Sequence, residues 1–148
     1  MDEQLLDQIK RILATGKDMT IATIRDDGFP QATTVSYVSD GMNIYFGCDL
    51  NAQKARNISR NNKVSLTIDL DYTDWNEIEG VSMAALAERI TDPDEMQHMG
   101  QLMLEKFPQV ASLIPDDPDT LTIIKVTPKV VSVLDYSKGF GHTDLVEL

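Results

Sequence analysis

Apolar and polar residues alternate strictly from Lys63 to Asp71, and this alternation limits the fold more than any other feature of the chain. The apolar positions are Val64, Leu66, Ile68 and Leu70. Successive side chains of a β-strand point to opposite faces of the sheet, so the segment predicts a half-buried strand with one polar face.

Turn signals define three strands before this one. Met19–Arg25 and Gln31–Ser39 flank a turn with the sequence DDGFP, and Asp40-Gly41 separates the second run from Met42–Cys48. Short runs that are rich in β-branched residues and joined by such turns favour local antiparallel pairing. We therefore expect these three runs to form a meander.

The second half of the chain predicts three more strands and an irregular end. Ile78–Ile90 is expected to be a strand that is interrupted near Gly80. Pro128 separates two further runs, Leu121–Val126 and Val130–Leu134. Proline cannot donate a hydrogen bond to a sheet, so we expect two strands there. The glycine-bearing tail that follows is expected to be irregular.

Three segments have helical patterns. One apolar stripe near the N-terminus ends before Gly16 and consists of Leu5, Leu6, Ile9, Ile12 and Leu13. The polar segment Asn51–Asn62 predicts a short helix that Asn51 or Asp49 caps. Asp92-Pro93-Asp94-Glu95 has the cap, proline and acid of a third helix start. Its apolar side is expected to pack in the core and carries Met96, Met99, Met103 and Phe107.

The predicted order is helix, three strands, helix, two strands, helix, two strands. Local antiparallel pairing with few long helices favours a mainly β (α+β) chain and a small barrel over a doubly wound sheet. The chain has 148 residues, which fits a single domain over 1–148.

Charge and cysteine content exclude several classes of function. The formal net charge of −11 repels nucleic acid and anionic membranes, so neither is an expected partner. The single cysteine, Cys48, allows no intrachain disulfide, and the acidic N-terminus does not resemble a signal peptide.

No apolar run is long enough to span a bilayer. His98 and His142 lack partners at metal-ligand spacing, so no metal is expected. We therefore expect a cytoplasmic protein.

The segment Cys48–Asn57 is the best candidate site. A strand ends there, a polar turn follows, and a helix begins near Lys54 and Arg56. Cations beside the positive end of a helix dipole are unfavourable unless both face an anion, such as a phosphate. The alternative is that Lys54 and Arg56 are solvated surface residues.

A series of short motifs between Thr20 and Asp69 adds a family resemblance. In order, the motifs are Gly28-Phe29-Pro30, Asp40-Gly41, Ile44-Tyr45-Phe46, Lys54-Ala55-Arg56-Asn57 and Asn62-Lys63-Val64-Ser65-Leu66. Together they resemble the FMN-binding split barrel of the pyridoxamine 5'-phosphate oxidase superfamily. The resemblance implies an antiparallel split β-barrel of Greek-key type with six to seven strands. It also implies a homodimer with FMN between the subunits.

The resemblance further implies residue roles. Lys54 would hold the flavin phosphate, and Gln53 stands where many members have a second basic residue. Cys48 and Asp49 would end a strand beside the phosphate, with Cys48 as a small buried residue rather than a redox nucleophile. Three strand residues would follow the isoalloxazine edge, namely Thr33, Thr34 and Val35. The alternative is that these residues are simply strand formers.

Two aromatic segments complete the expected site. Trp75 would stack on a flavin or a dimer partner, or pack at the barrel mouth. The tail Tyr136–His142 would fold over the ligand, and the alternative is a frayed terminus.

The first functional hypothesis is therefore an FMN-dependent oxidoreductase that acts on a small substrate or electron donor. No side chain is a convincing general base, so no catalytic residue is assigned. The vitamin B6 oxidase reaction is not supported because its basic substrate clamp is missing. The alternative hypothesis is a non-enzymatic module that binds flavin or haem for storage or sensing.

Overall fold

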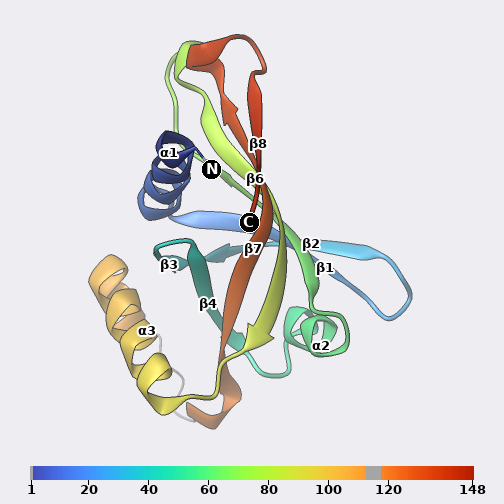
Figure 1. Cartoon of the computed structure of the whole chain (residues 1–148). Helices are drawn as coiled ribbons and strands as arrows, with labels where there is room; N and C mark the ends of the chain where they lie inside the picture. Colours follow the sequence, from blue (N-terminus) through green and yellow to red (C-terminus); the bar gives the residue numbers. More distant parts are fainter. Residues whose placement is uncertain (1, 113–117) are drawn as a thin grey trace.

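Eight antiparallel strands form one curled sheet in the computed structural model, which describes residues 2–112 and 118–148 (Figure 1). The helices are α1 (Glu3–Thr15), α2 (Gln53–Arg60) and α3 (Pro93–Lys106). The strands are β1 (Asp18–Ile24), β2 (Pro30–Ser36), β3 (Val38–Asp40), β4 (Asn43–Asp49), β5 (Lys63–Asp69), β6 (Glu79–Arg89), β7 (Leu121–Asp135) and β8 (Thr143–Glu147). The strand order is β2-β1-β5-β6-β7-β4-β3, and β8 pairs with β7. This arrangement confirms the expected antiparallel split barrel.

Tyr37 joins the two ends of this strand path. Strand β2 pairs with β1, whereas β3 pairs with β4, so the predicted meander is wrong. The predicted strand Gln31–Ser39 is divided at Tyr37, whose fully buried side chain donates a hydrogen bond to the Leu13 carbonyl oxygen at 2.7 Å. Closing a barrel requires the chain to change partners at a corner, and burial of Tyr37 fixes that corner.

Strand β7 runs unbroken through Pro128, so the prediction of two strands is wrong. The register between β6 and β7 shifts between Ala84 and Ala85, and Pro128 lies opposite Ala85. A β-bulge leaves a position without a ladder hydrogen bond, which is where a sheet tolerates proline.

The tail is also more regular than predicted. After a turn in which Gly139 and Gly141 adopt positive φ angles of 142° and 67°, β8 pairs with β7 and buries Val146. The described residues therefore form eight strands rather than seven, because one predicted strand divides, two merge and the tail adds one.

Helix α1 packs against β3 and β6, α2 against β1 and β6, and α3 against β3. Helix α1 is confirmed, with its apolar stripe buried and a cap at Asp2. Helix α3 begins as predicted, because the Asp92 carboxylate accepts a hydrogen bond from the Glu95 amide at 3.0 Å. Met99 is buried in a small second cluster, whereas Met96 is exposed. None of the described helices is long and apolar enough to cross a membrane.

Candidate functional site

Helix α2 begins without a side-chain cap. Its N-cap residue is Ala52, and no side chain accepts a hydrogen bond from the first turn, so the predicted caps at Asn51 and Asp49 are wrong. The Asp49 carboxylate instead accepts a hydrogen bond from the Asn51 amide at 2.7 Å, within the turn before the helix. The first turn contains Lys54 and no acidic residue. Its free N–H groups and the Lys54 ammonium together suit an anion.

Cys48 lies within the electrostatic reach of Lys54. Burial raises the pKa of the Cys48 thiol, while the Lys54 charge opposes that rise and the Asp49 carboxylate adds to it. The thiol is therefore protonated at neutral pH, which makes it a poor nucleophile. The same interaction means that the Lys54 ammonium acts on the end of β4, where the sequence predicts the phosphate.

Asn57 is the centre of a buried hydrogen-bond network on the side of α2 that faces β1 and β2. Its amide nitrogen donates to the Thr23 hydroxyl at 2.9 Å and to the Gln31 side-chain oxygen at 3.2 Å. Its oxygen accepts from Gln53 at 2.8 Å and from Arg60 at 3.1 Å. All four hydrogen bonds that an asparagine amide can make are satisfied, so the network fixes α2 on the barrel.

Sequence reasoning quoted Asn57 within a motif but did not assign it to the site. The only local signal for this position is an asparagine within a short, polar helix. Its partners Thr23 and Gln31 lie on strands β1 and β2, so no local sequence pattern predicts the hydrogen-bond network.

The strand residues proposed for the flavin ring divide between the two faces of β2. Thr33 and Val35 share the half-buried face with Gln31, whereas Thr34 is exposed on the other face. The Thr33 hydroxyl is buried and has no hydrogen-bond partner in the described ranges. The side chain of Thr33, but not that of Thr34, therefore lies on the face that meets α2.

The loop between β5 and β6, which carries Trp75, lies at the other end of β5 from α2 (Figure 1). The Trp75 indole is 61% exposed and stacks on Phe140, with 6.4 Å between ring centroids. Tyr136 meets the edge of Phe140 at 5.4 Å, and His142 contacts the Asp144 carboxylate at 3.0 Å. The structure thus brings Trp75 together with the tail, and within one chain neither joins Lys54.

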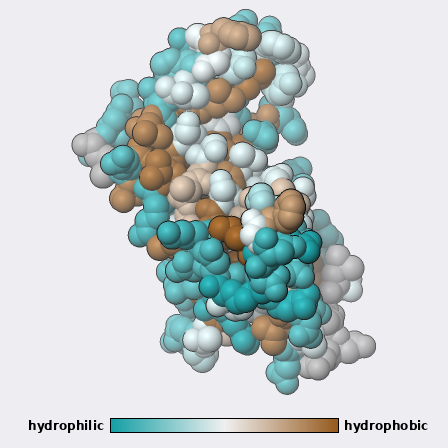
Figure 2. Space-filling view, turned by 90° about the vertical axis from the view of Figure 1, so that its right-hand side faces the viewer, coloured by the Kyte–Doolittle hydropathy of each residue, from teal (hydrophilic) through white to brown (hydrophobic). Residues whose placement is uncertain are grey.

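The molecular face that carries α2 and the β1–β2 hairpin is strongly hydrophilic in its lower part (Figure 2). Hydrophobic residues gather above this region, over the sheet. Among the residues with coordinates described, no three His, Cys, Asp or Glu side chains converge to hold a metal ion.

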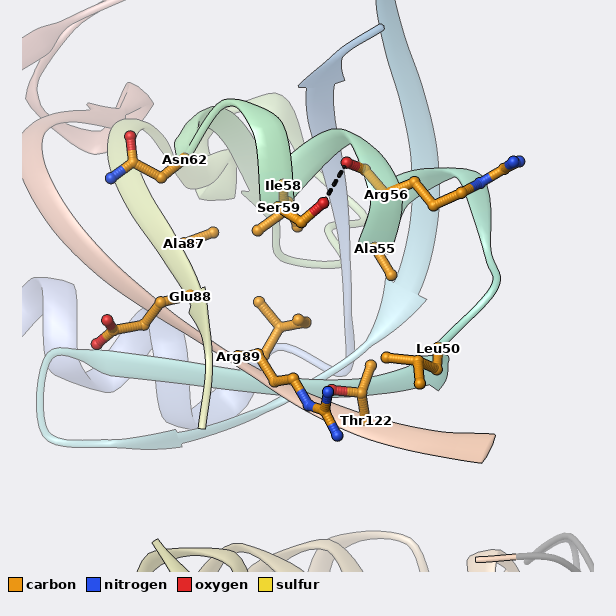
Figure 3. A pocket seen from close by; sticks show the side chains of 11 residues that line it. Leu50, Ala55, Arg56, Ile58, Ser59, Asn62, Ala87, Glu88, Arg89 and Thr122 are labelled. Carbon is orange, nitrogen blue, oxygen red and sulfur yellow. Dashed lines mark hydrogen bonds between the residues drawn. The ribbon is translucent and has the colours of Figure 1, made fainter. Parts of the chain in front are cut away.

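A cavity of about 360 Å³ lies on a different side of α2 from the Asn57 network, against β6 and β7 (Figure 3). Its polar lining includes Arg56, Arg89 and the buried Thr122. Sequence reasoning noted Arg56 only as a neighbour of Lys54 and missed the other two. They are distant in sequence, and only the pairing of β6 with β7 brings them to one pocket.

Comparisons with known proteins agree with this architecture. The model of the family described as pyridoxamine 5'-phosphate oxidase matches residues 5–135. A haem-binding protein from Mycobacterium smegmatis superimposes with a TM-score of 0.83 at 20% identity, over 99% of this chain and 59% of that one. The chain therefore spans less than two thirds of that protein.

Two further solved structures are similar. A candidate pyridoxamine 5'-phosphate oxidase from Listeria innocua has a TM-score of 0.72 at 22% identity, over 88% of this chain and 98% of that one. HutZ, the haem storage protein from Vibrio cholerae, has a TM-score of 0.69 at 18% identity, over 83% and 89%. At these identities the likeness establishes a shared fold. No curated protein sequence matches the chain.

Proposed function

This chain belongs to the pyridoxamine 5'-phosphate oxidase family, and from that premise we propose that it binds FMN at the start of α2 and passes electrons between the flavin and a small redox partner. The observation that carries the proposal is the uncapped first turn of α2, with Lys54 in it. A phosphate group supplies the negative charge and the hydrogen-bond acceptors that this turn lacks.

The residues around α2 fit a flavin phosphate through a small number of groups. Lys54 and the first-turn N–H groups would hold the phosphate. The Gln53 side chain already donates to Asn57 and accepts from Arg56 at 2.8 Å, so it orients the helix rather than the ligand. The unpaired Thr33 hydroxyl is a further group that a bound ligand would satisfy.

When bound, FMN itself supplies the redox chemistry, because its ring accepts and returns electrons. The protein would anchor the phosphate, orient the ring and limit the access of water. Cys48 would take no part in electron transfer as a thiolate, since burial keeps it protonated.

The proposal includes a homodimer. Exposed large apolar side chains support it, among them Phe29 at 69% and Leu145 at 67%. A symmetric interface is one way to remove such side chains from water. Sedimentation at several micromolar concentrations tests this expectation, and a monomer throughout would contradict it.

Haem binding is a second candidate function, and the names of two structurally similar proteins favour it. The two histidines of this chain do not support haem at α2. His98 contacts Asp40 at 3.3 Å, and His142 contacts Asp144 of β8 at 3.0 Å. An axial ligand from either histidine would put the haem elsewhere.

Absorption spectroscopy separates the two candidates. The purified protein is titrated with FMN, riboflavin and hemin, and the dissociation constant of each is measured. The proposal predicts that FMN binds more tightly than riboflavin, because only FMN has the phosphate. Reduction of the bound flavin by NADH or NADPH, followed by reoxidation with an acceptor, then tests turnover. Tight hemin binding with a Soret band and no FMN binding would favour haem.

A further inference from the structure

We propose that the cavity between α2, β6 and β7 is a second ligand site, which binds a small organic carboxylate with an apolar body. Lys54, the side chain assigned above to the flavin phosphate, does not line this cavity. The inference therefore goes beyond the proposed flavin function and does not depend on it.

The floor of the cavity favours a ligand with an apolar body. Four of its lining side chains are buried and aliphatic, namely Ala55, Ile58, Ala87 and Ile124. The side chains of Ala55, Ile58 and Ala87 point into the space between the helix and the two strands (Figure 3). The volume of about 360 Å³ is within the range of small-molecule sites, roughly 300–1,000 Å³.

Thr122 supplies an unused hydrogen-bonding group within this apolar floor. Its side chain is only 2% exposed, and its hydroxyl has no hydrogen-bond partner among residues that the structure describes. Its direct cross-strand partner is Cys48, whose thiol is a weak acceptor. Buried hydroxyls are normally paired, so this one indicates a position for an oxygen atom of a ligand.

Arg89 supplies the charge. It is the last residue of β6 and stands opposite Ile124 in the register, two positions from Thr122 along β7. Its exposed guanidinium forms no ion pair with any described side chain, whereas the Arg56 guanidinium is held by Gln53. In Figure 3 the Arg89 guanidinium and the Thr122 side chain lie at the same end of the cavity, and the Glu88 carboxylate extends away from them.

One guanidinium and one hydroxyl match a carboxylate in charge and in number of donors. Two parallel N–H groups of an arginine bind the two oxygens of a carboxylate, and the threonine hydroxyl donates a third hydrogen bond. A phosphate dianion would leave more charge unpaired at a partly apolar site. The geometry therefore favours the carboxylate, with its hydrocarbon part on the floor formed by α2, β6 and β7.

Nuclear magnetic resonance of the full chain tests the site, with sodium benzoate as the probe. Titration is expected to shift the backbone amide signals of residues 87–89 and 122–124, both with and without FMN. Benzamide, a neutral molecule of the same shape, is expected to bind about tenfold more weakly because it lacks the charge. Benzoate that shifts no signals in these segments at millimolar concentration would overturn the proposal.

Two variants identify the contacts. Arg89→Gln is expected to weaken benzoate binding about tenfold or more and to leave benzamide nearly unchanged. Thr122→Val removes the hydroxyl at nearly constant shape, so it is expected to weaken benzoate severalfold while the melting temperature stays the same or rises. The control is Lys129→Gln, an exposed cation on β7 outside the cavity. Equal benzoate affinities in all variants, each with a native-like spectrum, would also overturn the proposal.

Discussion

The Asn57 amide nitrogen lies 2.9 Å from the Thr23 hydroxyl oxygen and joins α2 to β1 across 34 residues of sequence. Both side chains are buried, at 0% and 1% exposure. The helix that carries the proposed phosphate contact is therefore positioned by a hydrogen bond to a residue outside the helix.

Replacing Asn57 should destabilise the protein. Asn57→Ala removes the partner of several buried groups, including the Thr23 hydroxyl and Gln31, and is expected to lower the free energy of unfolding by about 1–3 kcal/mol. Urea denaturation measures this change. Asn76→Ala, at an exposed position, is the control and should change stability little. An Asn57→Ala protein as stable as the wild type would show that the network does not fix α2.

Replacing Lys54 should weaken FMN binding without unfolding the protein. Loss of a charge-assisted hydrogen bond costs about 1.5–3 kcal/mol, or roughly a tenfold to hundredfold rise in the dissociation constant. Fluorescence titration with FMN measures the effect for Lys54→Ala. Riboflavin binding should respond little, and Lys63→Ala should leave both affinities unchanged. An unaltered FMN affinity in Lys54→Ala would remove Lys54 from the site.

Removing the hydroxyl of Thr33 separates stability from ligand binding. This hydroxyl has no partner in the described part of the chain, so Thr33→Val should leave the free energy of unfolding unchanged or raise it by up to about 1 kcal/mol. The same variant should bind FMN more weakly if the hydroxyl meets the flavin. Thr34→Val, on the exposed face of the same strand, is the control. A variant with lower stability and unchanged FMN affinity would contradict this interpretation.

The C-terminal strand should contribute to stability through Val146. This side chain is 7% exposed and packs in the main core, so Val146→Ala is expected to cost about 1–2 kcal/mol of unfolding free energy. Glu147→Ala affects a neighbouring side chain that is exposed and should leave stability nearly unchanged. Thermal and urea unfolding of both variants measure the difference. Equal effects would mean that β8 does not pack as described.

Stability should fall in acid partly through Asp135. Burial alone would raise the pKa of its carboxyl, but hydrogen bonds from Ser137 and Gln8 outweigh burial and hold the pKa below the ordinary 3.8. A carboxylate with a lowered native pKa stabilises the fold above its unfolded value. That contribution is lost as the pH falls through 3.8 toward the native pKa.

Asp135→Asn should therefore reduce the loss of stability in that pH window. Urea denaturation at neutral pH and at several acid pH values measures the slope. The slope should shrink rather than vanish, because hydrogen bonds from His142 and from the Phe29 amide lower the pKa values of Asp144 and Asp27 as well. Asp71→Asn, at an exposed position, is the control. An unchanged acid slope in Asp135→Asn would contradict the assignment.

Elements whose signals are local can be predicted from the sequence alone. The alternation of Lys63–Asp71 became strand β5, with every second side chain buried. The Asp92 cap of α3 and the apolar stripe of α1 were also predicted correctly, because a cap or a helical face involves residues only a few positions apart. The motif series likewise identified the family.

The pairing of the strands, and the pockets and networks that this pairing creates, depend on contacts between distant parts of the chain. Tyr37 ends one strand because its side chain enters the core, and β7 continues through Pro128 because a bulge at the neighbouring Lys129 shifts its register with β6. The Asn57 network and the pocket around Thr122 depend on residues from separate elements. Long-range packing and register select the strand partners. The sequence pattern within one strand therefore does not identify the strand that pairs with it.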